Sequence, residues 1–201
     1  MQGSGSRPLV GVLAVQGDFA EHQEALRRSG VETRQVRVPQ DLEGIDGLVL
    51  PGGESTTMLK LLDLQGLSEP LLDQIRAGLP VLATCAGLIL LASEVVEPAQ
   101  RSFGVLDITT ARNGYGRQIH SGTFPLEGDC LPTGASGVFI RAPRILRVGA
   151  GVEVLARWSG DPVLVRKGPI LGACFHPELQ PDHFVSQRFV ELLRPADARM
   201  T

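Results

Sequence analysis

The sequence has few cysteines, which argues against a domain stabilised by disulfides and against one built around a zinc ion. Its three cysteines, Cys85, Cys130 and Cys174, form no CxxC pair. An odd number of widely spaced thiols predicts neither a disulfide framework nor a zinc site. A reducing cytoplasm, where a thiol stays available for chemistry, is the setting we expect.

Segments typical of membrane or nucleic-acid binding are also missing. The apolar stretch 79–92 is too short to span a bilayer, and Pro80 and Gly87 interrupt it. Lys and Arg total 19 against 22 Asp and Glu, a net charge of -3, and no basic cluster marks a nucleic-acid face. Residues 1–7 lack the hydrophobic core of a signal peptide, so we interpret them as a disordered extension. We therefore expect neither a membrane nor a nucleic-acid partner.

The sequence does contain the alternating pattern of an α/β protein. Its 201 residues are 43% hydrophobic, which predicts one domain, placed at 8–195 with a tail at 196–201. Short apolar runs alternate with amphipathic segments, which predicts a parallel sheet with helices on both faces. The expected strands are 9–15, 33–38, 47–50 and 81–84, and the expected helices are 18–29, 55–64, 68–77 and 86–93, with Asp18 as the first N-cap.

The second half of the chain has a different pattern. Short β-rich segments separated by Gly and Pro predict hairpins added to the edge of the sheet, and an amphipathic helix closes the domain. The expected strands are 103–111, 117–124, 138–140, 152–158, 163–166 and 170–174, and the helix is 182–193.

Cys85 is the candidate nucleophile because it lies between a buried strand and the next helix. Such a corner exposes a side chain above the sheet and needs small neighbours, here Ala83 and Gly87. The helix N-terminus favours a thiolate, and the Ala86 amide is placed to bind an oxyanion. The alternative is a buried structural cysteine. Cys130 and Cys174 have no comparable context.

His176 and Glu178 are the candidate base and its orienting carboxylate. They are two residues apart in an extended segment, so both side chains point to the same side, and Pro177 stiffens the link. Glu178 would hold one imidazole nitrogen while the other faces Cys85. Taken alone, this segment could equally be interpreted as a turn that ends a strand.

The other histidines have weaker contexts. His22 lies in the first expected helix and His183 at the start of the last one, and we expect both at the surface. His120 falls on an expected strand and is a candidate neighbour of the site.

The glycine-rich turn at 51–55 permits three interpretations. Exposed amides at Gly52 and Gly53 could bind a phosphate, although the Lys and spacing of a P-loop are missing. The same amides could form an oxyanion hole beside the cysteine. The turn could also be only a helix cap made by Glu54 or Ser55.

Three blocks taken together resemble the class I glutamine amidotransferases. More narrowly, the sequence is similar to the glutaminase subunits of two-component pyridoxal 5′-phosphate synthases, from about residue 10 to 193. The blocks are PGGESTT at 51–57, TCAGLILLA at 84–92 and FHPEL at 175–179. Further matches are LAVQG at 13–17, RNGYGRQ at 112–118 and GVFIRAP at 137–143. The departures are Ala83, where glycine is usual, and Gly114, where a larger residue is common and a looser loop is expected.

The resemblance implies roles for named residues. It implies a flavodoxin-like three-layer α/β/α sandwich and a triad of Cys85, His176 and Glu178. Glutamine would be held by residues in the three matching blocks, and Gly53 and Ala86 would form the oxyanion hole. The implied glutamine contacts are Gly53, Glu54, Ser55, Arg112, Ile140 and Arg141. An arginine suits the α-carboxylate of an amino acid, and Glu54 suits its ammonium.

The resemblance also implies a reaction and a partner. The reaction is hydrolysis of L-glutamine without a metal or an organic cofactor. The ammonia would pass to a (β/α)₈-barrel synthase subunit, arranged as a dodecameric ring with glutaminase subunits around it. Three alternatives remain: a glutaminase of another pathway such as histidine biosynthesis, a cysteine peptidase or deglycase-like protein, and a non-catalytic binding subunit. The block at 112–118 disfavours the first.

Overall fold

A seven-stranded sheet forms the centre of the molecule. The computed structural model describes residues 7–112, 114 and 121–193. The strand order is β10-β11-β12-β4-β3-β1-β2. Their bounds are β1 Leu9–Leu13, β2 Glu32–Val36, β3 Gly47–Leu50, β4 Val81–Thr84, β10 Glu153–Trp158, β11 Asp161–Lys167 and β12 Ile170–Ala173.

Five neighbouring strands of this sheet are parallel. Strands β2, β1, β3, β4 and β12 pair in parallel, and β10 and β11 continue the sheet as an antiparallel edge. Strands β3, β4 and β12 are completely buried, as expected for parallel strands covered on both faces. The order β2-β1-β3-β4-β12 is that of a flavodoxin-like sheet, which places a ligand crevice at the carboxyl ends near β1 and β3.

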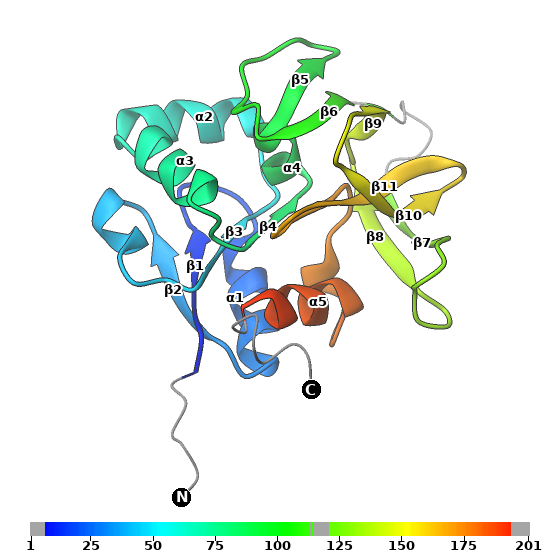
Figure 1. Cartoon of the computed structure of the whole chain (residues 1–201), viewed down its shortest axis with the longest axis horizontal. Helices are drawn as coiled ribbons and strands as arrows, with labels where there is room; N and C mark the ends of the chain where they lie inside the picture. The colour runs from blue at the N-terminus through cyan, green and yellow to red at the C-terminus, as the bar shows by residue number, and fades with distance from the viewer. Residues whose placement is uncertain (1–6, 113, 115–120, 194–201) are drawn as a thin grey trace, which may run out of the picture.

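Helices cover both faces of the sheet (Figure 1). One layer contains α1 (Phe19–Arg28) and α5 (Phe184–Leu192), and the other contains α2 (Ser55–Leu64), α3 (Ser68–Arg76) and α4 (Ala86–Leu91). Helix α5 packs closely on β3, since a β-carbon at Gly47 would lie 3.1 Å from the Phe189 ring. The predicted three-layer α/β/α sandwich is therefore confirmed.

Two smaller sheets lie beside the sandwich. Strands β5 (Ala92–Val96), β6 (Leu106–Ala111) and β9 (Arg144–Val148) form one, and β7 (Ser121–Pro125) with β8 (Ser136–Ile140) forms the other. Stacked aromatic rings join the β7–β8 hairpin to the main sheet, with Phe124 and Trp158 centroids 4.6 Å apart. The 3₁₀ helices η1 (Pro39–Leu42) and η2 (Pro177–Leu179) complete the described elements.

Several sequence predictions need correction. Only β10 and β11 extend the main sheet as the expected antiparallel edge, because β12 pairs in parallel with β4 and the remaining late strands form the two smaller sheets. The helix expected at 86–93 ends at Leu91, and β5 begins at Ala92, since this segment pairs with β6. Strand β9 was not predicted. The expected strand 117–124 is described only from Ser121 onward.

The ends of the chain stay predictions. Residues 1–6 and 194–201 lie outside the described part, so the domain limits at 8 and 195 are expectations from the sequence. In the described ranges, no helix combines the length and apolar character required to cross a bilayer.

Replacing Gly87 by alanine should destabilise the fold. Helix propensity alone would predict a gain of about 1 kcal/mol, because alanine is the better helix former. However, a β-carbon at Gly87 would lie 2.1 Å from the backbone oxygen of Leu50, which no rotamer change relieves. We expect Gly87→Ala to lower the free energy of unfolding by about 3 kcal/mol in urea denaturation.

The matched control is Lys60→Ala, at an exposed position of α2. It should change the unfolding free energy by no more than about 0.5 kcal/mol. A stabilised Gly87→Ala protein would show that α4 does not pack on β3 as described.

Candidate active site

Four neighbouring parallel strands deliver residues to one pocket. Segments following β1, β3, β4 and β12 meet at the carboxyl edge of the sheet, where ligands bind in such folds. The pocket has a volume of about 350 Å³, in the range of small-molecule sites. Its lining comprises Gln16, Gly17, Asp18, Gly53, Glu54, Ser55, Cys85, Ile89, Arg112, Ile140, Arg141 and His176.

Cys85 occupies a strained corner between β4 and α4. Its backbone has φ 47° and ψ -104°, a conformation that a residue other than glycine rarely adopts. The Cys85 amide bonds to the Ala173 carbonyl at 2.8 Å, so β12 holds the corner from the neighbouring strand. The side chain lines the pocket from the N-cap position of α4, as predicted for the nucleophile.

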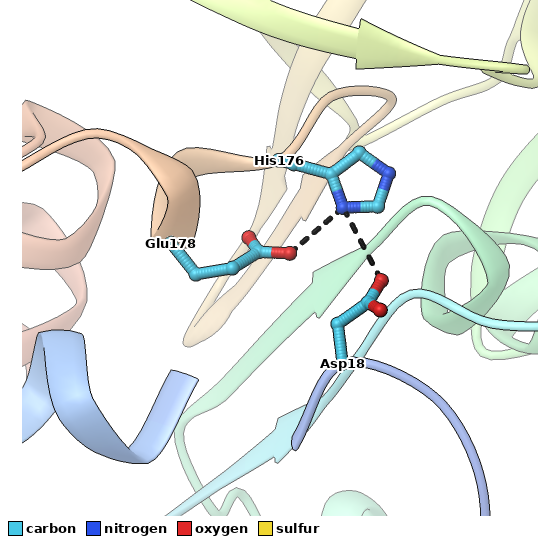
Figure 2. A group of neighbouring side chains, drawn as sticks. All are labelled: Asp18, His176 and Glu178. Carbon is cyan, nitrogen blue, oxygen red and sulfur yellow. Dashed lines mark hydrogen bonds and ion pairs between the residues drawn. The ribbon is translucent and has the colours of Figure 1, made fainter. Parts of the chain in front are cut away.

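The side chains of His176 and Glu178 are hydrogen-bonded to each other (Figure 2). His176 Nδ1 lies 2.7 Å from Glu178 Oε1, and both side chains are almost completely buried. His176 follows β12 and is the N-cap of η2, which contains Glu178. The predicted contact between the two side chains is therefore present, but the extended segment expected from the sequence is wrong, because Glu178 lies in the 3₁₀ helix.

The charges around His176 favour its imidazolium form. Burial alone would lower the pKa of His176, but contact with Cys85 and the bond to Glu178 raise it to about 10. The Nε2 atom makes no hydrogen bond of normal geometry with the described residues. Burial also disfavours the Glu178 carboxylate, yet His22 and His176 hold the pKa of Glu178 below its usual range. The group is suited to a thiolate–imidazolium pair with a carboxylate behind it.

Asp18 adds a second carboxylate beside His176. Its Oδ2 lies 3.6 Å from His176 Nδ1. Figure 2 shows the Asp18 carboxylate pointing toward the imidazole. The capping of α1 by the Asp18 side chain, which the sequence predicted, is absent. Asp18, His176 and Glu178 present donor atoms within 4.8 Å of one another, so this is the group that could hold a metal ion in the described residues. A metal on Nδ1 would replace the His176–Glu178 hydrogen bond, whereas the triad chemistry uses that bond.

The predicted surface positions of His22 and His183 are wrong. His22 is only 2% exposed, and its Nε2 lies 3.0 Å from Thr84 Oγ1 and 3.3 Å from Glu178 Oε2. His183 caps α5 through Nδ1, which accepts from the Val185 amide. Both residues occur on helices with many polar side chains, so the sequence pattern alone placed them on the wrong face.

The glycine-rich turn is held tightly against the site. A β-carbon at Gly52 would lie 2.6 Å from His176 Cε1, so only glycine allows this approach. The Gly52 carbonyl accepts from the Asp18 amide at 3.2 Å, and the Glu54 amide donates to Gln16 Oε1 at 2.8 Å. Gly53 lines the pocket, and Ala86 directly follows Cys85 at the start of α4.

Glu54 acts as the N-cap of α2, one of the predicted alternatives. Its carboxylate accepts from the amides of Thr56 and Thr57 at 3.2 and 2.7 Å. Burial raises the pKa of Glu54, but the hydrogen bonds from Thr57 and Thr56 together outweigh this effect and lower the pKa to about 2. Arg112 Nη2 lies 2.7 Å from Glu54 Oε1. The two residues expected to bind opposite ends of an amino acid are therefore paired with each other at the pocket wall.

Of the remaining expected contacts, Ile140 and Arg141 reach the pocket from the end of β8, whereas Ser55 begins α2. Ile140 ends β8 and Arg141 follows with a φ of 45°, while Ser55 Oγ donates to Gln100 Oε1 at 2.9 Å. Gly114 lies against Arg144, since a β-carbon there would come within 2.0 Å of Arg144 Cβ. Residues 113 and 115–120 of this loop lie outside the described part, so the looser loop expected from the sequence stays a prediction. His120 and residues 115–118 lie outside the described part.

Sequence reasoning missed several residues of the pocket. Gln16 and Asp18 follow β1, Ile89 is on α4, and Gln100 supports Ser55 from the loop after β5. The segment after β1 could have been identified, because a flavodoxin-like strand order places it at the crevice. Nothing in the sequence links Gln100 to Ser55, since the contact joins separate elements.

A thiol, an imidazole and a carboxylate above a flavodoxin-like sheet are typical of cysteine-dependent hydrolases that cleave acyl groups. Comparison with known proteins defines the group further: the chain belongs to the SNO glutamine amidotransferase family, whose model matches residues 12–194.

Similar proteins agree with this membership. The chain is 49% identical to the pyridoxal 5′-phosphate synthase subunit PdxT of Thermotoga neapolitana, over 92% of this chain and 99% of that protein. It is 52% identical to the PdxT subunit of Mycobacteroides abscessus, over 93% and 98% of the two chains. A solved structure described as a glutamine amidotransferase superposes with a TM-score of 0.86 at 48% identity, covering 92% of this chain and 98% of that one.

Replacing Glu178 by glutamine should disturb the orientation of the His176 imidazole without affecting the binding of glutamine. The amide cannot hold the imidazolium of His176 as the carboxylate does, so we expect kcat for glutamine hydrolysis to fall roughly 10²- to 10⁴-fold. The KM for glutamine should change little, because Glu178 does not line the pocket. Steady-state glutamate release measures both constants.

The control for this substitution is Glu24→Gln, at a solvent-exposed carboxylate on α1. It should leave both constants unchanged. An unaltered rate in Glu178→Gln would mean that the His176–Glu178 hydrogen bond has no part in turnover.

Proposed function

We propose that this chain hydrolyses the side-chain amide of L-glutamine, as the glutaminase subunit of a pyridoxal 5′-phosphate synthase. The observation that carries the proposal is that Cys85 and His176 line one pocket, with Glu178 hydrogen-bonded to His176 behind it. Membership of a glutamine amidotransferase family and about 50% identity to synthase subunits support the substrate and the pathway.

The first half of the reaction forms a thioester. The Cys85 thiolate attacks the amide carbon of glutamine, and the oxygen becomes an oxyanion held by the amides of Gly53 and Ala86. The tetrahedral intermediate collapses, and His176 donates its proton to the departing nitrogen, which leaves as ammonia. The products of this step are a glutamyl thioester on Cys85 and a neutral His176.

The second half releases glutamate. His176, now neutral, removes a proton from a water molecule that attacks the thioester carbon. The same oxyanion hole holds the second tetrahedral intermediate, and the thiolate leaves with His176 protonated again. Glu178 keeps the imidazole in the required tautomer throughout.

The pocket wall would recognise the amino-acid end of glutamine. We assign the α-carboxylate to Arg112, which can form charge-assisted hydrogen bonds, and the ammonium to Glu54. Ser55, Ile140 and Arg141 would complete the contacts at the pocket wall. Because Arg112 and Glu54 are paired with each other, glutamine would open or share this ion pair.

The ammonia would pass to a synthase subunit that makes pyridoxal 5′-phosphate from a pentose phosphate and a triose phosphate. We propose that this partner is a (β/α)₈ barrel in a dodecameric ring, with this chain bound around it. The support is the sequence resemblance, together with relatives whose names describe them as synthase subunits. The cytoplasmic setting stays a prediction from the sequence.

Replacing Cys85 by alanine should abolish glutamate release while the fold is retained. The alanine variant has no nucleophile, and no other described thiol lines the pocket. Burial raises the pKa of Cys174 well above its usual range, and Cys130 is exposed elsewhere on the surface. Glutamate release is measured by a coupled dehydrogenase assay, and circular dichroism checks the fold.

The matched controls are Cys130→Ala and Cys174→Ala, which should both remain active. Glutamate release at the wild-type rate by Cys85→Ala would overturn the assignment of the nucleophile.

The isolated chain should be a poor glutaminase until its synthase partner binds. Hydrolysis without an acceptor wastes glutamine, and the oxyanion hole is a sensitive control point, because losing one donor costs roughly 10²- to 10³-fold in rate. The peptide between Gly52 and Gly53 can turn over at little steric cost, although the Gly52 carbonyl would lose its bond to the Asp18 amide. The surface near residues 51–57 should then adjoin the partner.

The test is steady-state glutamate release by the purified chain, alone and with saturating synthase subunit. We expect a rise of roughly 10²-fold or more on binding. Cys85→Ala bound to the same partner controls for glutaminase activity in the partner preparation. Equal rates with and without a bound partner would refute the coupling.

A further inference from the structure

A buried histidine outside the triad lies against the back of Glu178. His22 comes from α1, whereas Glu178 belongs to η2 at the other end of the chain, and the two elements pack together. His22 Nε2 lies 3.3 Å from Glu178 Oε2 and 3.0 Å from Thr84 Oγ1, the residue just before Cys85. His22 is thus in contact with both strand-end segments that carry the thiol and the base.

The Oε2 atom of Glu178, which faces His22, requires a hydrogen-bond donor. The Oε1 atom accepts from His176, but Oε2 has no hydrogen bond of normal geometry among the residues described. The side chain is completely buried, and a buried carboxylate oxygen without a donor is costly. A small rotation of either side chain would bring the His22 N–H onto Oε2. A lone pair on Nε2 would instead face the carboxylate, so the tautomer with the proton on Nε2 is favoured.

The surroundings of His22 keep it a neutral donor. Burial lowers the pKa of His22, although Glu178, Asp18 and Glu21 oppose this change and His176 adds to it. A neutral imidazole can direct its N–H at Glu178 without cancelling the carboxylate charge. The full negative charge then remains available to the imidazolium of His176.

We propose that His22 is a positioning residue, which holds the Glu178 carboxylate in the orientation that binds His176. Thr84 Oγ1 shares the His22 N–H and ties the imidazole to β4. The proposal rests on the glutaminase triad proposed above, and it extends the supporting chain to Cys85, His176, Glu178 and His22. A purely structural His22 would only fill space between α1 and the sheet.

Two substitutions distinguish a His22 that donates a hydrogen bond to Glu178 from a His22 that only fills space. His22→Leu keeps an apolar side chain of moderate size but removes the N–H, whereas His22→Gln keeps an N–H donor near the position of Nε2. Gln23→Leu is the matched control, because Gln23 is equally buried on the same helix but bonds to Thr33 and Gln35, away from Glu178.

The first measurement is glutamine hydrolysis with the synthase partner bound. His22→Leu should lose roughly 10- to 100-fold in kcat, the range expected for a hydrogen bond to a charged group, with the KM for glutamine within about twofold. His22→Gln should recover most of the rate, and Gln23→Leu should match the wild type. Thermal melting of each variant checks that it is folded.

The second measurement does not depend on glutamine. The rate at which iodoacetamide alkylates Cys85, followed against pH by peptide mass spectrometry, reports how strongly His176 supports the thiolate. In His22→Leu the inflection should move to higher pH, because a misplaced Glu178 supports the imidazolium less well. His22→Gln and Gln23→Leu should keep the wild-type profile.

The two measurements distinguish failure of this proposal from failure of the proposed function. A wild-type chain that releases no glutamate would refute the function, while a shifted alkylation profile in His22→Leu would still support positioning by His22. Unchanged profiles and rates in His22→Leu would overturn the proposal. Equal losses in His22→Leu and His22→Gln would overturn it too, because they would indicate packing rather than hydrogen bonding.

Discussion

Parallel pairing of β3, β4 and β12 is the constraint on which the site depends. Because these strands run in one direction, their carboxyl ends lie at one edge and bring Gly53, Cys85 and His176 to a single pocket. The Cys85 amide bonds to β12, so the candidate nucleophile and the segment leading to the candidate base share one rigid framework. A site built on buried strand ends holds its geometry better than one built on loops alone.

Glycines allow elements to pack closely around Cys85 and His176. Gly87 allows α4 to lie directly on the end of β3, and Gly52 allows the glycine-rich turn to touch the His176 ring. The strained φ of Cys85 is tolerated because the strand on one side and the helix on the other hold it. Small residues at these places are therefore required by contact between elements, and the local helix or strand preference is secondary.

The parallel half of the fold could be predicted from sequence better than the late strands. Apolar runs at β1, β3 and β4 and the amphipathic helices between them have periodicities that local reasoning detects. Strands β5 and β9 were missed, because their pairing with β6 decides their conformation and their sequence has no strong pattern of its own. Likewise, Gln100 is linked to the site only through its contact with Ser55, which joins distant segments.

The sequence by itself singled out Cys85, His176 and Glu178 as the predicted chemistry-bearing residues, because each lies in a short motif whose residue types suit a catalytic role. It also determined the α/β class through its alternation of periodicities. Only the tertiary structure decided that His22 and Asp18 lie beside the His176–Glu178 pair and that Arg112 pairs with Glu54. The physical reason is that burial and ion pairing depend on which elements pack together, and a helical pattern alone does not show which polar residue faces the sheet.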